Sequence, residues 1–283
     1  MIISIGDIAI SLKGITEEKL PSDLRPYTVD SVKKIDATCE FSRDIKNIES
    51  SKTLYDSSFT WRVEKNGSFI SICIYTGSAK KYCFQKLIFT DDYTKAVAFI
   101  DTAQLNYGDN LFPLRQPLLE LWYSFLLMNN RGILVHGLGV KTDKGVNIFI
   151  GKSGAGKSTL GGIFAKEGVG EILSDDRLII RKKEDGFYVY GTPWHGEARF
   201  ATASYGKLDK IYHLEQSAYC ETVLAKPSLS ASTLFSCCFI AGWPRDETLK
   251  FVLDYCSDIA EQVDLYTLKF RPDTTSLIET GYL

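Results

Sequence analysis

The chain has 283 residues, of which 45% are hydrophobic, and this is enough apolar material for one large domain or two modest ones. Its formal net charge of −2 gives no basic surplus for nucleic acid, and its seven cysteines, with no C-x-x-C pair, fit a reducing compartment better than a secreted protein. No apolar run approaches the length that crosses a bilayer, so we expect a cytoplasmic protein with neither a membrane nor a nucleic-acid partner.

The first third of the chain contains short runs that alternate apolar and polar residues. This pattern recurs at residues 2–12, 58–63, 68–75, 81–89 and 96–101. Asn66-Gly67 is typical of a two-residue hairpin turn. We expect residues 1–105 to form a small, mainly antiparallel β-rich domain. Its core and cross-strand pairs are expected to include Phe59, Trp61, Phe69, Tyr75, Tyr82, Phe84 and Phe89.

A helical period follows at residues 115–129, where Leu118, Trp122 and Phe125 are among the apolar residues at helical spacing. We expect an amphipathic helix within a linking segment, residues 106–131, whose apolar face packs between the β-rich domain and the later part of the chain. A membrane-surface role is less expected, because lysine and arginine are nearly absent from its polar face.

The most informative stretch is residues 146–160, where an apolar run breaks into glycines. The pattern G-x-x-x-x-G-K-[ST] is met by Gly151, Gly156, Lys157 and Ser158, between a predicted buried strand and a predicted helix. It predicts a phosphate-binding loop, or Walker A motif, because glycines let successive N–H groups converge on phosphate oxygens at the positive end of the helix. A glycine-rich turn that only joins strand to helix is the plainer alternative, and the flanking elements weigh against it.

The loop assigns roles to its residues. The residues expected to hold the nucleotide are Gly151, Lys152, Ser153, Gly154, Ala155, Gly156, Lys157, Ser158 and Thr159. Lys157 is expected to reach the β- and γ-phosphates, and the Ser158 hydroxyl to contact Mg²⁺. The motif indicates a nucleotide and leaves the phosphoryl acceptor open.

Two adjacent carboxylates, Asp175 and Asp176, interrupt an apolar run at residues 171–180. Neighbouring anions at a strand edge repel each other unless a cation lies beside them, so we expect a Mg²⁺ site or a proton acceptor. The alternative is a solvated Asp-Asp turn between two strands.

The predicted loop at residues 191–197 combines Trp194, His195 and Glu197 with glycines, a composition typical of a functional site. The alternative is an ordered turn whose Trp194 side chain fills the core. His136 ends an apolar strand and has a structural alternative as a hydrogen-bonded core residue, and we expect His213 to be structural. The tail predicts a helix, a helix and a strand at residues 228–240, 246–256 and 259–270. Its expected core residues are Leu234, Phe235, Cys238, Leu249, Phe251, Val252 and Leu253.

The order His136-Gly137, then the loop at 151–158, then Ser174-Asp175-Asp176-Arg177 resembles the catalytic domain of the HPr kinase/phosphorylase family and its HPr-kinase-like relatives. The 191–197 loop and Phe270-Arg271-Pro272-Asp273 are similar to the kinase-like relatives, including those encoded with lasso-peptide precursors. The resemblance implies an α/β fold shared with phosphoenolpyruvate carboxykinases, with a P-loop kinase domain and mixed sheet at residues 132–283. The chain has no clear counterpart of that family's phosphorolysis signature, so the resemblance implies kinase activity rather than phosphorolysis.

The resemblance also implies individual roles. Asp176 corresponds to the general base toward a hydroxyl, and Asp175 joins Ser158 on the Mg²⁺ side, although these two roles could be exchanged. His136 is placed near the γ-phosphate or the paired aspartates. Arg199 is the preferred catalytic arginine, with Arg177, Arg245 and Arg271 as alternatives, and His195 and Glu197 are candidates for acceptor or phosphate contacts.

Together these observations predict an ATP- and Mg²⁺-dependent kinase that transfers the γ-phosphoryl group to a hydroxyl, preferably a serine, of a protein or peptide. A kinase of a small hydroxylated metabolite is the first alternative. A nucleotide-dependent switch or transport ATPase is less expected, because neither Leu-Ser-Gly-Gly-Gln nor Asn-Lys-x-Asp occurs. Residues 1–105 carry no phosphate-binding or paired-carboxylate feature, so we expect them to select the acceptor.

Overall fold

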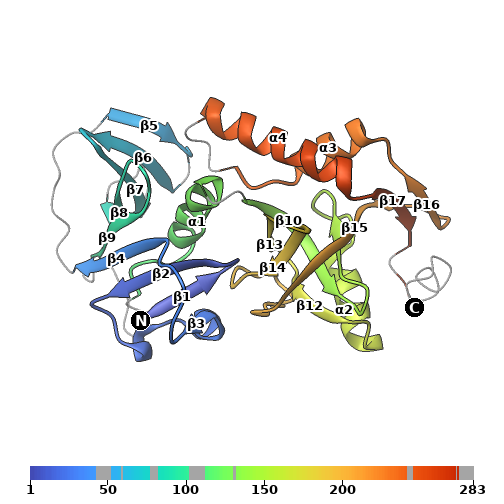
Figure 1. The fold of residues 1–283 in the computed structure, drawn as a ribbon, viewed down its shortest axis with the longest axis horizontal. Helices are drawn as coiled ribbons and strands as arrows, with labels where there is room; N and C mark the ends of the chain where they lie inside the picture. The colour runs from blue at the N-terminus through green and yellow to red at the C-terminus, as the bar shows by residue number, and fades with distance from the viewer. Residues whose placement is uncertain are drawn as a thin grey trace. The chain divides into compact units, whose positions relative to one another are not determined.

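The computed structural model describes residues 1–42, 52–58, 60–76, 82–101, 112–129, 132–240, 245–271 and 273. These residues form two mixed sheets and a few helices, which confirms the α/β class (Figure 1). The chain divides into two compact units: unit 1 is Met1–Leu126 with Ala241–Arg245, and unit 2 is Leu127–Ile240 with Asp246–Leu283. None of the described helices combines the length and the apolar character needed to cross a membrane.

Unit 1 contains a nine-stranded sheet among its described residues, in the order β3-β1-β2-β4-β9-β8-β7-β6-β5. The strands are β1 (Ile2–Ile5), β2 (Ile8–Lys13), β3 (Thr28–Val29), β4 (Ala37–Ser42), β5 (Lys52–Asp56), β6 (Trp61–Asn66), β7 (Phe69–Thr76), β8 (Tyr82–Thr90) and β9 (Lys95–Ile100). Two short 3-10 helices, η1 (Glu17–Lys19) and η2 (Ser22–Tyr27), lie between β2 and β3. The described pairings are antiparallel except β2–β4 and β4–β9, which confirms the mainly antiparallel sheet.

Three details of unit 1 differ from expectation. The predicted strand at 2–12 is split by a turn at Gly6 and Asp7, both at positive φ. Asn66 pairs with Phe69, so the hairpin turn is Gly67-Ser68, one residue later than predicted, with Gly67 in the left-handed region. Phe69 is 51% exposed and is not a core residue, whereas Phe89 is fully buried. Trp61, Tyr75 and Phe84 are half-buried. The side chains of Phe59 and Tyr82 lie outside the described residues.

Helix α1 (Leu118–Asn129) is buried on all sides from Leu118 to Leu127, so the expectation of an amphipathic helix is wrong. The reason is tertiary packing within unit 1. Trp122 Nε1 donates to the Tyr93 carbonyl at 2.9 Å, and Tyr123 donates its hydroxyl to the Ile8 carbonyl at 3.2 Å. Residues 106–111 and 130–131 of the expected linking segment lie outside the described residues.

The described part of unit 2 contains an eight-stranded sheet in the order β11-β10-β13-β14-β15-β17-β16, with β12 paired to β10 and β11 also paired to β15. The strands are β10 (Gly132–Lys141), β11 (Val146–Ile150), β12 (Glu171–Ser174), β13 (Arg177–Lys183), β14 (Gly186–Gly191), β15 (Tyr205–Gln216), β16 (Glu221–Leu224) and β17 (Leu265–Phe270). The helices are α2 (Lys157–Glu167), α3 (Pro227–Ser236) and α4 (Arg245–Gln262).

Side chains of β11 alternate between two apolar cores. Ile148 and Ile150 pack with residues of α3 and α4, such as Leu234 and Ile259, while Phe149 packs with α2. Helix α2 and the α3–α4 pair therefore cover opposite faces of this sheet (Figure 1).

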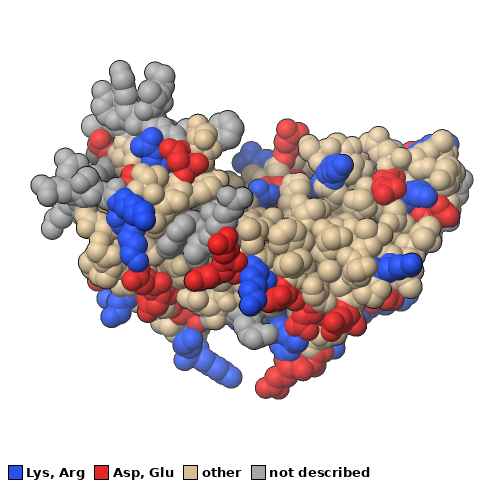
Figure 2. Space-filling view, turned by 90° about the horizontal axis from the view of Figure 1, so that it is seen from above, with Lys and Arg blue, Asp and Glu red and all other residues tan. Residues whose placement is uncertain are grey.

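The tail differs from the prediction in its boundaries. Helix α4 continues to Gln262 because Ile259 is one of its buried residues, so the strand expected from residue 259 begins only at Leu265. Leu253, expected in the core, is 47% exposed. On the face shown in Figure 2, positive and negative side chains are interspersed and neither sign predominates, as the near-zero net charge suggests.

Candidate functional site

Strand register brings distant residues of unit 2 into neighbouring positions. His136 of β10 lies opposite Arg177 of β13, and the next residue, Gly137, lies opposite Ile150 at the end of β11. Ile150 in turn is paired with His213 of β15. The start of the loop after β11 therefore lies beside His136 on one side and His213 on the other.

Residues 151–156, which we call the glycine loop, connect β11 to α2. Gly151, Gly154 and Gly156 have φ values of 155°, 80° and 107°, which favour glycine. Gly156 is the N-cap residue of α2, and no side chain in the described part of the chain makes a capping hydrogen bond there. The N–H groups of the first helical turn lack intrahelical acceptors and carry the positive end of the helix dipole, which is an arrangement that can bind an anion.

Lys157 is the first residue of α2 and only 7% exposed. Its Nζ donates to the carbonyl oxygens of Gly151 at 2.6 Å and Lys152 at 3.2 Å, so the ammonium lies at the beginning of the glycine loop. Burial lowers the pKa of Lys157, while Cys237 and Asp176 act in the opposite direction. Phosphate oxygens in this position would offer the ammonium charged acceptors in place of carbonyls.

Asp175 and Asp176 form the turn between β12 and β13. The Ser174 hydroxyl accepts the N–H groups of Asp176 and Arg177, both at 3.2 Å, and fixes the turn. Asp175 is 3% exposed, and the Asp176 side chain is 20% exposed. A turn between strands is present as in the alternative interpretation, but its carboxylates are largely buried rather than solvated.

The Asp175 carboxylate holds the 191–197 loop in place through two hydrogen bonds. Its Oδ1 accepts the Gly196 N–H at 2.9 Å and its Oδ2 accepts the Ala198 N–H at 3.0 Å. A Cβ on Gly196 would lie 2.9 Å from Asp175 Oδ2, so the close approach requires glycine there. Both oxygens of Asp175 are used in holding the backbone on either side of Glu197.

Asp176 makes a different set of contacts. Its Oδ1 lies 2.6 Å from His136 Nδ1 and 2.7 Å from Arg177 Nη1. Its Oδ2 accepts no hydrogen bond within the described part of the chain. Burial raises the pKa of Asp176, but the hydrogen bond from His136 and the charges of Arg177, His136 and Lys157 outweigh it, so the pKa lies below the ordinary aspartate value. Asp176 is thus an ionised carboxylate with one oxygen held and one available.

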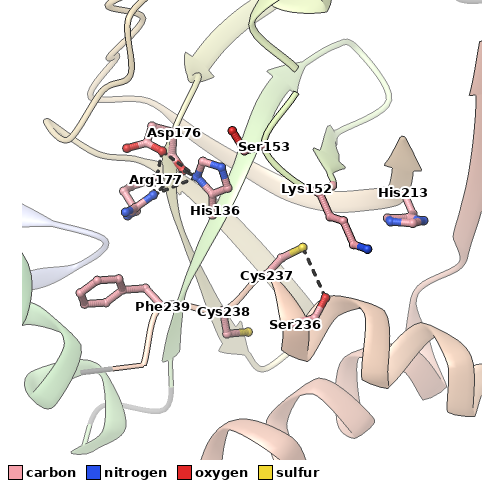
Figure 3. A pocket seen from close by; sticks show the side chains of 11 residues that line it. His136, Lys152, Ser153, Asp176, Arg177, His213, Ser236, Cys237, Cys238 and Phe239 are labelled. Carbon is pink, nitrogen blue, oxygen red and sulfur yellow. Dashed lines mark hydrogen bonds and ion pairs between the residues drawn. The ribbon is translucent and has the colours of Figure 1, made fainter. Parts of the chain in front are cut away.

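Two cavities adjoin this carboxylate. The first, about 360 Å³, is lined by the helix start and glycine loop and by Asp176, Glu197 and Gln216. We call it the loop cavity. The second, about 430 Å³, is lined by Lys152, Arg177, His213 and the Ser236–Phe239 segment, and we call it the thiol cavity after Cys237 and Cys238 (Figure 3). His136, Ser153 and Asp176 line both cavities.

Most of the residues expected at the site line the loop cavity. These are His136, Ser153, Gly154, Gly156, Lys157, Ser158, Thr159, Asp175, Asp176 and Glu197. Gly151 and Lys152 line the thiol cavity instead, and Ala155 packs against the apolar core of α2.

Other expected residues lie outside both cavities. Arg199 is exposed, has a φ of 60° and lines neither cavity. His195 also lines neither cavity, and its Nδ1 is 3.0 Å from the Gly196 carbonyl oxygen. Among the alternative arginines, Arg177 lies beside Asp176 and lines the thiol cavity. Arg271 pairs with Asp273 at 3.4 Å, and the Arg245 side chain is outside the described residues. Trp194 is buried, as in the interpretation in which it fills the core.

Sequence reasoning missed residues of both cavities, among them Ser236 and Phe239 of the thiol cavity. Gln216 donates to the Gly154 carbonyl at 2.7 Å and lines the loop cavity. His213, expected to be structural only, and Cys237 line the thiol cavity. Strand pairing places His213 and Gln216 here, and a backbone hydrogen bond from the His136 N–H to the Cys237 carbonyl places Cys237, so no local pattern could have identified them.

No group of three or more His, Cys, Asp or Glu side chains in the described ranges is arranged to hold a metal by itself. Mg²⁺ commonly uses one or two carboxylates together with waters and substrate phosphates, and the oxygen donors Ser158, Asp176 and Glu197 line one cavity. This donor set fits Mg²⁺ accompanied by a nucleotide.

The chain matches no protein-family model and no curated protein.

Proposed function

We propose that unit 2 is a P-loop kinase domain of HPr-kinase-like type and that it transfers the γ-phosphoryl group of ATP to a hydroxyl with the help of Mg²⁺. The observation that supports this most is the joint lining of one cavity by Lys157 and Asp176. A buried ammonium on a glycine loop and an ionised carboxylate with an available oxygen are the two groups that phosphoryl transfer to a hydroxyl requires.

The glycine loop and the start of α2 would hold the nucleotide phosphates. Backbone N–H groups of the first helical turn and the Lys157 ammonium supply positive charge in a partly enclosed space, where electrostatic interactions are stronger than in water. Thr159 and Gln216 also line the loop cavity.

Ser158 and Glu197 would hold Mg²⁺ beside the phosphates. Asp175 is less suited to that role, because both of its oxygens accept backbone hydrogen bonds, whereas Glu197 is exposed into the loop cavity between the two amides that Asp175 fixes. When bound, Mg²⁺ supplies charge neutralisation of the phosphate oxygens.

Asp176 would accept the proton of the attacking hydroxyl. His136 and Arg177 hold its Oδ1, which orients Oδ2 and keeps the carboxylate ionised at neutral pH. Asp175 then acts as a positioning residue. This assignment retains the proposed roles of Asp176 and His136 and adds Glu197 to the metal side.

For the acceptor we propose a serine of a protein or peptide, because unit 1 supplies none of the residues that line the two cavities and is available for recognition. A small hydroxylated compound is the second candidate, favoured by the volume of the thiol cavity, about 430 Å³. The seven cysteines are all free thiols, which supports a cytoplasmic location.

The test is ATP cleavage by Asp176→Asn with water as the acceptor. Loss of a general base lowers the chemical step by about 10²–10⁴-fold, while ATP affinity remains close to that of the wild type. ADP formation and calorimetric ATP binding are the two measurements. An Asp176→Asn protein that cleaves ATP at the wild-type rate would refute the proposed role of this carboxylate.

A further inference from the structure

The thiol cavity shares one wall with the loop cavity and differs from it elsewhere. His136, Ser153 and Asp176 form the common wall, whereas Lys157 and Ser158 line only the loop cavity. The thiol cavity therefore contains the first residues of the glycine loop, Gly151 to Ser153, but lacks Lys157 and Ser158, the two side chains proposed to bind the phosphates and Mg²⁺.

Phosphoryl transfer requires the attacking and leaving oxygens to lie roughly in line on opposite sides of the phosphorus. With the nucleotide in the loop cavity, an acceptor hydroxyl reaches the γ-phosphorus and Asp176 from the thiol cavity. Its oxygen then bonds to phosphorus, the bond from phosphorus to the ADP oxygen breaks with its electron pair leaving on ADP, and the hydroxyl proton passes to Asp176.

The charges around the thiol cavity indicate what else the acceptor carries. Figure 3 shows Lys152 and His213 on one side of the cavity, and Asp176 with Arg177 and His136 on the other. Arg177 is already paired with Asp176, which is the sole carboxylate among the lining residues described. Lys152 Nζ makes no ion pair or hydrogen bond with the described residues.

The remaining lining is neutral or apolar. Burial lowers the pKa of His213, so its imidazole is a neutral hydrogen-bonding group near pH 7. Cys237 is half-buried, and the Phe239 ring lies under the Arg177 guanidinium at 5.4 Å. Glu215 lies 3.6 Å from His213 Nδ1 but is not among the lining residues. Lys152 thus supplies a positive charge that no ion pair in the described part of the chain neutralises, on the other side of the cavity from Asp176.

We propose that the thiol cavity receives the acceptor, and that this acceptor carries an anionic group, a carboxylate or phosphate, a few atoms from its hydroxyl, with Lys152 as the residue that binds it. This inference rests on the proposed kinase function. The cavity's 430 Å³ lies within the range of small-molecule sites. Either a small hydroxy acid or an acidic residue beside a serine of a peptide has this chemistry.

Cys237 offers a direct probe, because its thiol lines the cavity and Cys220 provides a half-buried reference thiol outside it. We would treat the full-length protein with anionic sulfonatoethyl methanethiosulfonate and with its cationic trimethylammonium analogue. Mass spectrometry gives the rate at each cysteine, and Cys237→Ser identifies the signal of Cys237 against that of Cys238.

The anionic-to-cationic rate ratio at Cys237 should exceed that at Cys220 by about fivefold or more, as expected for one nearby positive charge. Lys152→Met should bring the ratio close to that of Cys220, while the matched control Lys166→Met, at the exposed end of α2, should leave it unchanged. An equal or smaller ratio at Cys237, or one that Lys152→Met does not change, would overturn the anionic preference.

Protection of Cys237 distinguishes the acceptor sources. Glycerate, a blocked Ala-Ser-Glu-Ala peptide and uncharged glycerol are added with Mg²⁺ and ADP. Slower modification with glycerate or with the peptide supports the proposal and identifies the source, whereas no protection by either anion, or equal protection by glycerol, contradicts it.

Measuring ATP binding before and after modification of Cys237 distinguishes failure of this inference from failure of the proposed function. Protein modified at Cys237 should bind ATP with an affinity within about twofold of the unmodified protein, because its label lies outside the loop cavity. Loss of ATP binding on modification would show that the thiol cavity belongs to the nucleotide site and would overturn the inference alone. Absence of ATP binding in the unmodified protein would refute the proposed function itself.

Discussion

Asp175→Asn tests whether this buried carboxylate positions the 191–197 loop or binds a metal. Asp175 accepts two backbone N–H groups, from Gly196 and Ala198, one on each oxygen. Asparagine keeps one acceptor oxygen but turns an NH₂ group toward the second N–H. The substitution therefore loses one charge-assisted bond, worth about 1.5–3 kcal/mol, and leaves a buried donor unsatisfied at a further cost of about 1–3 kcal/mol.

The expected loss of local stability is about 3–5 kcal/mol, which corresponds to amide exchange at least about 100-fold faster at Gly196 and Ala198. Hydrogen exchange read by mass spectrometry on the 191–202 peptide measures it. The control is Asp185→Asn, where an exposed carboxylate accepts from Tyr188 and Lys207, and its removal should leave amide exchange close to that of the wild type. Unchanged exchange at Gly196 and Ala198, accompanied by a higher Mg²⁺ requirement for ATP cleavage, would refute this reasoning and make Asp175 a metal ligand.

Two further predictions concern the loop cavity. Glu197→Gln should raise the Mg²⁺ concentration for half-maximal ATP cleavage by roughly tenfold, since it replaces a carboxylate oxygen by a neutral one without changing the backbone that Asp175 holds; an unchanged Mg²⁺ titration would remove Glu197 from the metal side. The acid limb of the pH profile of kcat should lie below about pH 4, because the pKa of Asp176 is lowered from the ordinary aspartate value near 3.9. A limb near pH 6.5, ordinary for histidine, would instead indicate His136 as the proton acceptor.

Local patterns predicted the parts of the site that are continuous in sequence. The glycine loop follows an apolar strand and precedes a helix as expected, because positive φ at Gly151, Gly154 and Gly156 and the start of α2 are determined within a few residues. The turn at Asp175 and Asp176 was likewise visible, since two carboxylates break an apolar run.

Contacts between distant segments were not predictable in this way. His136 lies beside Asp176 because β10 pairs with β13 in a register that sets His136 opposite Arg177, and no local signal determines that register. The burial of α1 on all sides likewise depends on packing by residues as distant as Ile8. Asp175 and Asp176 differ in their proposed roles because Asp175 accepts hydrogen bonds from the N–H groups of Gly196 and Ala198, more than twenty residues later in the chain.

Calorimetric titration of ATP in the presence of Mg²⁺ tests most directly whether the glycine loop binds Mg²⁺-ATP through Lys157. Lys157→Ala should weaken binding by about 10- to 100-fold, the usual worth of a charged hydrogen bond, while Lys166→Met on the exposed side of α2 should bind as the wild type does. Equal affinity of wild type and Lys157→Ala, or no binding by the wild type, would contradict the account.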